Sequence, residues 1–262
     1  MTRFTLLALS ASALVLLPGS AAGQTRHYPL ESLDGLGLLN VTAEPATLHG
    51  RKGLRLTLSD ETRQRLKTLE GMTPEERKKN MTPEELTRIG RGLPFLDQLA
   101  WLQDLDFSSG VIEVELAGDL EPGAAEGARG FVGIAFRLQE DKATYDTFYL
   151  RPTNARAQDQ ERRNRTVQYM SHPEWPWPRL RKETPAKYES YVDLVPGEWT
   201  KIRIDVRGEQ ARLYVRDHEQ PTLIVNDVKS GAHGKGMVAL WIGPGTVAQF
   251  RNLTVTLAPG EK

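Results

Sequence analysis

From residue 110 to the C-terminus, hydrophobic and polar residues alternate in the manner of β-strands. In the segment 110–116, Ile112 and Val114 alternate with Glu113 and Glu115. A period of two is typical of a strand with one buried face and one solvated face. Similar runs recur at short spacing and are separated by turn residues. The pattern predicts further strands over residues 131–138, 144–151, 166–170, 188–194, 199–206, 211–215, 222–225, 238–242 and 250–257.

Two segments nearer the N-terminus, residues 38–43 and 53–58, have the same strand character. Nine or more strands without intervening helices favour a sandwich, because parallel strands are joined by crossover helices. We therefore expect an all-β fold, a jelly-roll sandwich of two antiparallel sheets. Residues 24–262 are expected to form this single domain.

Residues 60–93 break the strand pattern with many charged and helix-forming residues. The sequence Thr-Pro-Glu-Glu occurs at 73–76 and again at 82–85. Each copy supplies Thr as the N-cap, Pro at the first helical position and Glu at the third, which is typical of a helix start. We predict two short helices inserted between strands, serving either as plain structure or as a lid or docking flap.

The first 23 residues have the pattern of a secretory signal peptide. Arg3 is the basic residue, residues 4–17 are an apolar segment, and residues 18–23 are mostly small. This apolar segment is shorter than the ~20 residues of a membrane span. We expect the mature chain to begin near Gly23 or Gln24, to have no membrane span, and to be secreted or periplasmic. There is no cysteine, so disulfides and thiol nucleophiles are excluded.

The overall charge is balanced, but one segment is basic. Without the leader, 33 lysines and arginines face 34 aspartates and glutamates, a formal charge of −1. This balance argues against a nucleic-acid or anionic-membrane partner. Residues 151–182 nevertheless hold eight cations against three acids. They are either a solvated surface or part of a binding site.

Residues 171–184 read SHPEWPWPRLRKET, which combines aromatic, basic and proline residues. Prolines at 173, 176 and 178 remove amide donors and bias the preceding residues toward extended backbone. We therefore predict a stiff loop and exclude a helix. Its side chains Trp175, Trp177, Arg179 and Lys182 suit the wall of a ligand site. In an alternative structural role, Trp177 would plug the end of the core.

The strand over residues 144–151 places Tyr149 and Arg151 on one face. Aromatic rings stack on the apolar face of a sugar, and guanidinium groups bind hydroxyls or carboxylates. The next strand can add Gln168 to this surface, and the polar loop between the strands carries Asn154, Arg162 and Arg163. The alternative is that the tyrosines are ordinary strand residues.

Candidates for acid-base chemistry are His172, Glu183 and Asp159. The five histidines lack the spacing of a zinc site, and no GxSxG motif is present. No cofactor is expected. A structural calcium ion is conceivable, but Asp217, Asn226 and Asp227 lack a diagnostic spacing. The paired carboxylates of a laminarinase-type ExDxxE strand are also absent, since Ala117 and Gly118 follow Glu113 and Glu115.

Several segments resemble a known family. RGFVGIAFR, YDTFYLRPTNARAQDQERRNRTVQY, PWPRLRKETPAKYESYVDL, GEWTKIRIDV and ALWIGPGTVAQFRNLTV are similar to concanavalin A-like and laminin-G-like jelly-roll domains. More narrowly, they resemble the bacterial 3-keto-disaccharide hydrolases. The resemblance covers residues 36–58 and 97–257 and departs at the 60–93 insert.

This resemblance implies a carbohydrate ligand on the concave sheet and, for some members, cleavage of glycosides already oxidised at C3. The ketone acidifies the C2 proton, so a base can expel the glycosidic oxygen by elimination. Arg151, Arg163 or Lys182 could then stabilise the enolate. Three interpretations remain: a carbohydrate-active lyase or hydrolase, a non-catalytic sugar-binding module, and a structural jelly roll. The ligand could also be acidic, since the arginines suit a uronate or sulfate. The sequence leaves the sugar and the oligomeric state open.

Overall fold

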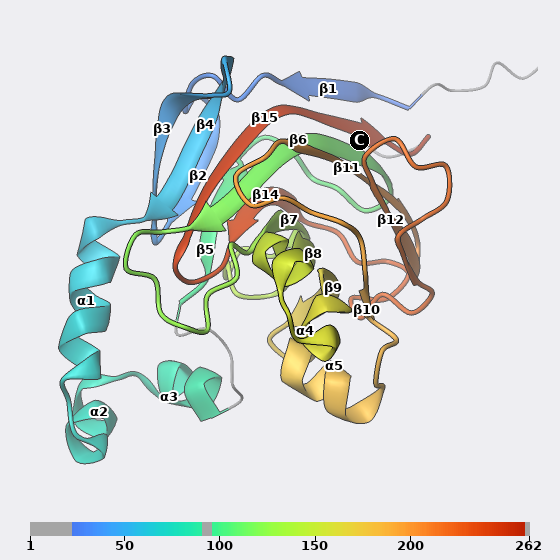
Figure 1. Ribbon diagram of the computed structural model, residues 1–262. Helices are drawn as coiled ribbons and strands as arrows, with labels where there is room; N and C mark the ends of the chain where they lie inside the picture. The colour runs from blue at the N-terminus through green and yellow to red at the C-terminus, as the bar shows by residue number, and fades with distance from the viewer. Residues whose placement is uncertain (1–22, 91–95, 260–262) are drawn as a thin grey trace, which may run out of the picture.

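The computed structural model describes residues 23–90 and 96–259. Within them, 15 strands pair antiparallel into two sheets that pack as a sandwich (Figure 1). The predicted all-β jelly-roll sandwich is therefore confirmed. The expected signal peptide, apart from Gly23, and the last three residues of the expected insert lie outside the described residues.

The first sheet has eight strands, in the order β13-β12-β11-β6-β15-β4-β3, with β1 also paired to β15. Its members are β1 (Thr25–Tyr28), β3 (Val41–Leu48), β4 (Arg51–Leu58), β6 (Gly110–Leu120), β11 (Thr200–Arg207), β12 (Gln210–Val215), β13 (Leu223–Val225) and β15 (Thr246–Leu257).

The second sheet has seven strands, in the order β10-β9-β8-β7-β14-β5-β2. Its members are β2 (Leu36–Leu39), β5 (Gln98–Leu102), β7 (Val132–Leu138), β8 (Tyr145–Leu150), β9 (Val167–His172), β10 (Glu189–Ser190) and β14 (Met237–Ile242). Strands β7, β8 and β9 are buried along their whole length. Both faces of this sheet are therefore covered, one by the opposite sheet and the other by irregular segments and short helices.

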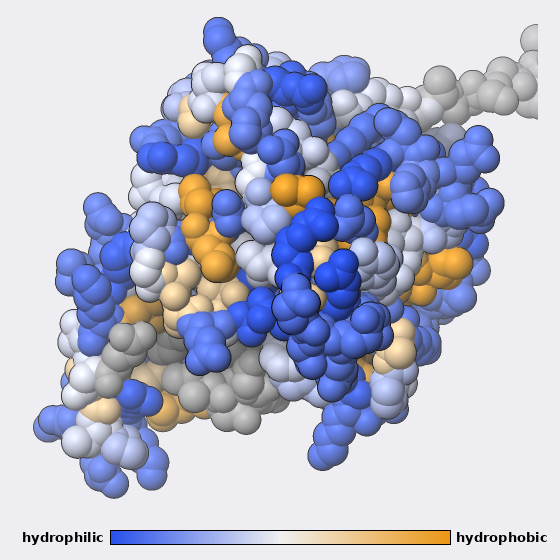
Figure 2. Space-filling model, in the orientation of Figure 1, coloured by the Kyte–Doolittle hydropathy of each residue, from blue (hydrophilic) through white to orange (hydrophobic). Residues whose placement is uncertain are grey.

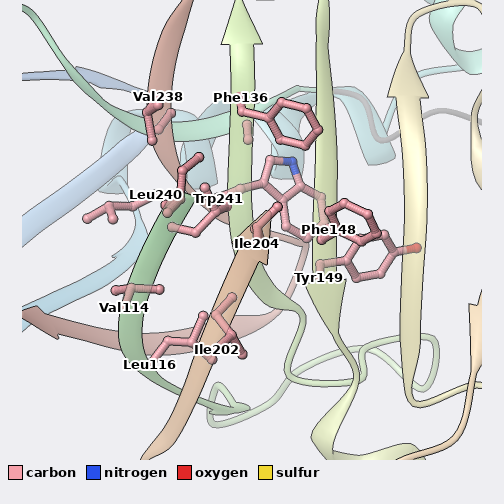
Figure 3. Packing of buried hydrophobic residues seen from close by; sticks show 14 of the residues in the cluster. Val114, Leu116, Phe136, Phe148, Tyr149, Ile202, Ile204, Val238, Leu240 and Trp241 are labelled. Atoms are coloured by element: carbon pink, nitrogen blue, oxygen red, sulfur yellow. The ribbon is translucent and has the colours of Figure 1, made fainter. Parts of the chain in front are cut away.

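The core lies between the sheets and consists of aliphatic and aromatic side chains at alternate strand positions. Figure 3 shows Val114, Ile204, Phe148 and Leu240 in one packed cluster, and each is at most 1% exposed. The first two belong to the eight-stranded sheet and the last two to the seven-stranded sheet. Burial of such side chains contributes about 1.5–3 kcal/mol each to stability.

In the part of the chain that the structure describes, six short helical segments connect the strands. They are α1 (Asp60–Glu70), α2 (Pro74–Asn80), α3 (Pro83–Gly90), the 3-10 helix η1 (Pro152–Arg156), α4 (Gln160–Arg163) and α5 (Trp177–Glu183). Helices α1–α3 form an arm to one side of the sandwich (Figure 1). Thr73 and Glu76 form the predicted capping box of α2, and Thr82 and Glu85 make the equivalent bonds before α3. The insert thus has three helices where two were expected, because Ser59 caps an additional one.

The prediction that residues 171–184 exclude a helix is wrong for their second half. Helix α5 begins at Trp177, directly after Pro176 as its N-cap. Pro178 lies in the first turn, where an amide has no intrahelical partner to lose. Two of the three prolines therefore precede the helix, and the third fits its start.

Two strand predictions also need correction. The expected strand 188–194 is reduced to β10, because the amide of Val192 bonds to the Thr166 hydroxyl instead of a strand carbonyl. The expected strand 38–43 is split at Asn40, whose φ of 60° sends β2 and β3 into different sheets. Strands β1 and β5 were not predicted.

Candidate functional site

A row of residues across the seven-stranded sheet forms the floor of the candidate site. Tyr149 of β8 is in register with Gly133 of β7, and Gly133 is in register with Trp241 of β14. Their sequence neighbours Phe148 and Leu240 point into the core, so Tyr149 and Trp241 project from the opposite face. The two rings lie 4.9 Å apart between centroids.

Gly133 allows this floor to form. A Cβ atom at position 133 would lie 2.6 Å from the Cβ atom of Tyr149 and 2.2 Å from the carbonyl oxygen of Phe148. No side chain fits there without displacing Tyr149. The glycine is therefore required by the close approach of the two aromatic residues around it.

A cavity of about 370 Å³ lies above this floor. Phe131, Met170 and Trp177 contribute to its walls together with Tyr149 and Trp241. The remaining lining residues are Ala125, Gly127, Ala128, His172, Pro176, Pro244 and Gly245. Concave sites that combine aromatic walls with a few polar groups are the usual form of a small-molecule site. We call this space the aromatic cavity.

Helix α5 positions one tryptophan at the cavity and the other away from it. Trp177 is 36% exposed and lines the cavity, with the guanidinium of Arg181 4.4 Å from its ring centroid. Trp175 instead packs against the core, with Arg179 at 3.7 Å and Lys229 at 4.6 Å from its ring centroid. The alternative in which Trp177 plugs the core is therefore wrong, since Trp175 has the more buried position. The cations next to the tryptophans serve as cation–π partners.

His172 ends β9 beside the aromatic cavity and belongs to a buried polar network. Its Nδ1 atom lies 2.9 Å from the hydroxyl of Tyr145 and 3.2 Å from Oδ1 of Asp97. The Tyr145 hydroxyl donates to Asp97 at 2.6 Å and accepts from Nε1 of Trp241 at 3.1 Å. Since the single hydroxyl proton is directed to Asp97, the network assigns the imidazole proton to Nδ1.

In the neutral form of His172, the other imidazole nitrogen therefore has the lone pair. Nε2 is buried and has no hydrogen-bond partner among the described residues. A carboxylate behind Nδ1 with a lone pair at Nε2 is the arrangement of a general base. The whole His172 side chain is 0% exposed, however, so a substrate proton reaches Nε2 only if a wall of the cavity shifts.

A second cavity of about 430 Å³ adjoins the first, and the two share Gly127, Phe131 and Trp177 as walls. Five arginines line it: Arg129, Arg151, Arg162, Arg165 and Arg181. The other lining residues are Asn154, Asp159 and Glu161. We call this space the arginine cavity, and both cavities together the cleft. In Figure 2, hydrophilic residues dominate the face that carries α4 and α5.

Glu189 is the buried counter-ion beneath the arginine cavity. Its carboxylate, 6% exposed, pairs with Arg151 at 3.1 Å, with Arg165 at 3.5 Å and with Arg181. Burial alone would raise the pKa of Glu189, but the hydrogen bond from Arg181 and the charge of Arg151 outweigh it and lower the pKa.

Arg151 connects the two cavities. Its guanidinium donates to the Tyr149 hydroxyl at 2.7 Å and to Oε1 of Gln168 at 2.8 Å. Burial raises the pKa of Tyr149, which keeps its hydroxyl neutral. The predicted shared face of Tyr149, Arg151 and Gln168 is thus present, with Gln168 as a support for Arg151.

Some of the predicted site residues line the cleft, and others do not. Tyr149, His172 and Trp177 line the aromatic cavity, whereas Arg151, Asn154, Asp159, Arg162 and again Trp177 line the arginine cavity. Arg163, Gln168, Trp175, Arg179, Lys182 and Glu183 line neither. Glu183 is instead paired with Arg179 at 2.9 Å, and Arg163 bonds to the carbonyl of Ala157.

The site residues that were not predicted include Arg165 and Arg181 of the arginine cavity, and also Trp241, Phe131, Arg129 and Asp97. Trp241 and Phe131 are in segments with strand patterns, where an aromatic residue is normally interpreted as part of the hydrophobic core. Arg129 lies in a glycine- and alanine-rich connection, and Asp97 lies before the unpredicted strand β5. Only the length and small-residue content of the 121–130 segment indicate a functional loop.

The segment considered for calcium gives little support to such a site. Asp227 accepts from Lys187, Lys229 and Tyr188 at 2.6–2.8 Å, so its carboxylate is already paired. In residues 23–90 and 96–259, no three acidic or histidine side chains converge as a metal site would require. Nor does that part of the chain include a helix long and apolar enough to cross a membrane.

Comparisons with known proteins give the fold class. No family model and no curated protein matches the chain, so the resemblance to the 3-keto-disaccharide hydrolases stays a prediction. A Bacillus subtilis protein of unknown function with a galectin-like fold is 12% identical, with a TM-score of 0.50, over 92% of this chain and 99% of its own.

Two further solved structures are similar at a lower score. The carbohydrate-binding module CBM66 from Bacillus subtilis is 11% identical, with a TM-score of 0.49, over 85% of this chain and 96% of its own. A Bacillus licheniformis β-glucanase is 14% identical, with a TM-score of 0.45, over 90% of this chain and 99% of its own. At 12% identity, the likeness to the Bacillus subtilis protein of unknown function concerns the fold alone, which is galectin-like in that protein.

Proposed function

We propose that this protein binds a carbohydrate in the cleft and acts on it as an enzyme. The ligand class is supported by the aromatic cavity, which is lined by Tyr149, Trp241 and the partly exposed Trp177 and adjoins the guanidinium donors of the arginine cavity. Sugar rings stack on aromatic side chains through their C–H groups and bond to guanidinium donors through their hydroxyls. Export by the N-terminal leader would place the protein where extracellular glycosides occur.

The observation that carries the catalytic part is the Asp97–His172 pair. Asp97 and Tyr145 hold Nδ1 of the imidazole, Nε2 has no hydrogen-bond partner in the described part of the chain, and His172 is one of the residues that line the aromatic cavity. We assign His172 as the general base and Asp97 as the residue that positions it. This assignment needs no second catalytic carboxylate.

The reaction class that fits a single base is elimination from a glycoside with a ketone at C3. Nε2 takes the proton from C2, and the C2–H electron pair forms an enolate with the C3 ketone. The enolate then collapses to a C1–C2 double bond as the C1–O bond breaks, and the leaving oxygen takes up the proton from the imidazolium. Later hydration of the double bond would complete net hydrolysis. The substrate class comes from the family resemblance, and the geometry supports only the presence of the base.

Among the residues considered for stabilising the enolate, Arg151 is the best placed. It lines the cleft and contacts Tyr149, whereas Arg163 and Lys182 line neither cavity. A guanidinium 4% exposed, in a site with little water, stabilises developing negative charge more strongly than an exposed one.

The burial of His172 favours a second candidate function, a non-catalytic sugar-binding module. With its ring 0% exposed, His172 would then serve only to hold Tyr145 and Trp241 in the floor of the cleft. The two candidates share the ligand and differ in turnover.

One experiment separates the two candidates. The purified protein is incubated with glycosides and with their 3-keto derivatives, and both binding and product are followed. Turnover of a 3-keto glycoside that is lost in His172→Asn supports the enzyme. Binding without product across the panel supports the module, and the absence of any binding refutes both.

A further inference from the structure

The arginine cavity has more positive charge than its own carboxylates neutralise. Its five arginines are accompanied by three carboxylates, those of Asp159, Glu161 and the buried Glu189. Two positive charges therefore remain in excess within one cavity. Outside the cavity, Arg156 has a carboxylate partner of its own, Asp193, at 3.1 Å.

The available carboxylates are concentrated on three of the five arginines. Glu189 pairs with Arg151, Arg165 and Arg181, and Glu161 pairs with Arg165. The carboxylate of Asp159 accepts the backbone amide of Arg162 as the N-cap of α4. None of these acids is within ion-pair distance of the guanidinium groups of Arg129 and Arg162.

Arg129 and Arg162 bond only to neutral oxygens among the described residues. Arg129 donates to the carbonyls of Glu126 and Ala128, and Arg162 donates to Oδ1 of Asn154 at 3.0 Å. Burial and the nearby charges of Arg162 and Arg151 lower the pKa of Arg129, against the opposing charge of Glu126. Since arginines stay charged at neutral pH, Arg129 and Arg162 repel each other, and an anion between them would relieve this repulsion.

The position of this cluster relates it to the aromatic cavity. Trp177, Phe131 and Gly127 are walls of both cavities. A sugar ring stacked on Trp177 would therefore present its substituents to the arginine cavity. Planar guanidinium groups bind carboxylate and sulfate groups through paired hydrogen bonds.

We propose that the arginine cavity binds the anionic substituent, a carboxylate or a sulfate, of an acidic sugar whose ring lies in the aromatic cavity. Arg129 and Arg162 are its main ligands, and Arg165 and Arg181 complete it. This inference rests on the proposed carbohydrate function and narrows its substrate class.

Matched ligands test the proposal by calorimetric titration. A set of neutral oligosaccharides is compared with counterparts that have a C6 carboxylate and with counterparts that have a C6 sulfate. The variant Arg129→Gln/Arg162→Gln removes the two main ligands. The control Arg156→Gln/Arg163→Gln removes the same charge from arginines outside both cavities.

We expect the wild-type protein and the control to prefer one acidic series over the neutral series by roughly 10- to 100-fold, an effect that weakens with added salt. The double variant should reduce this ratio to about 1. The preferred series distinguishes a uronate from a sulfated sugar.

Equal affinity for neutral and acidic ligands in the wild-type protein would overturn the anionic subsite and leave the proposed function intact. A preference that survives in the double variant would also overturn it. If no member of the set binds, the subsite and the carbohydrate function fail together.

Discussion

The Nδ1 atom of His172 lies 3.2 Å from Oδ1 of Asp97, a residue 75 positions earlier in the chain. The last residue of β9 and the residue before β5 meet here, and the hydroxyl of Tyr145 is within hydrogen-bond distance of both side chains. The network assigns a proton to Nδ1, so the neutral imidazole has its lone pair on Nε2. A catalytic role for the cleft depends on this pair.

Substitution of the pair should separate binding from turnover. In His172→Asn we expect kcat to fall by about 10²–10⁴-fold, the usual contribution of a general base, with KM little changed. Asp97→Asn should lower kcat less, by about tenfold, because the imidazole remains and only its orientation is weakened. Steady-state kinetics on the turned-over glycoside give both constants, and circular dichroism confirms folding. Loss of affinity with unchanged kcat would show that both residues have a structural role and not a catalytic one.

The two tryptophans of the 171–184 segment should have opposite effects. Trp177→Ala is expected to weaken glycoside binding by about tenfold or more and to change stability by less than about 1 kcal/mol, since the ring is a partly exposed wall. Trp175→Ala should destabilise the protein by about 2–3 kcal/mol, because its ring packs on the core beneath Arg179 and Lys229. Urea unfolding and ligand titration of the two variants serve as mutual controls. A reversed order of effects would refute the placement of the cleft.

Glu189 should be essential for stability. Its replacement by Gln leaves Arg151, itself buried, without its counter-ion, and removal of one partner from a buried pair costs about 3–5 kcal/mol. The control is Glu183→Gln, which breaks an exposed pair with Arg179 and should cost less than about 1 kcal/mol. Thermal unfolding of both variants gives the melting temperatures to be compared. Similar melting temperatures would show that Glu189 does not organise the arginines.

The carboxylate of Asp227 should make stability depend on pH below 4. Burial opposes its ionisation, but the bonds from Lys187, Lys229 and Tyr188 prevail and lower its pKa to about 2. Since the folded value lies below the ordinary value of 3.8, ionised Asp227 stabilises the fold above that pH. This contribution is lost as the pH falls toward 2.

Asp227→Asn should therefore be less stable than the wild-type protein at pH 7, and the difference should shrink as the pH falls to about 2. Urea titrations at several pH values measure it. The control is Asp217→Asn, whose carboxylate is 93% exposed and 4.0 Å from Lys201. A difference that is constant with pH would contradict the proposed linkage.

The sequence predicted the sandwich because alternation along a strand is a local property. The period of two placed Tyr149 and Arg151 on one face, and the structure has them there with Gln168 beside them. The capping pattern at Thr73 likewise located the start of α2 correctly. The number of prolines led to the wrong prediction that residues 171–184 exclude a helix. Pro178 lies in the first turn of α5, where proline is tolerated.

The rest of the site depends on strand order, which no local pattern contains. Trp241 reaches Tyr149 because β14 and β8 both pair with β7. Asp97 reaches His172 only through the polar network at one end of the sheet, and the 60–93 insert separates it from the strands that precede it. Arg129 and Arg162 come together through the packing of connecting segments. The sequence shows their charges, but it does not show which arginines lack a carboxylate as an ion-pair partner.

The most direct test of the account is a crystal structure with the tightest-binding glycoside of the panel. We predict the sugar ring over Tyr149 and Trp241, against Trp177, with a ring substituent directed toward Arg129 and Arg162. A sugar bound elsewhere, such as on the eight-stranded sheet, would contradict the proposed site.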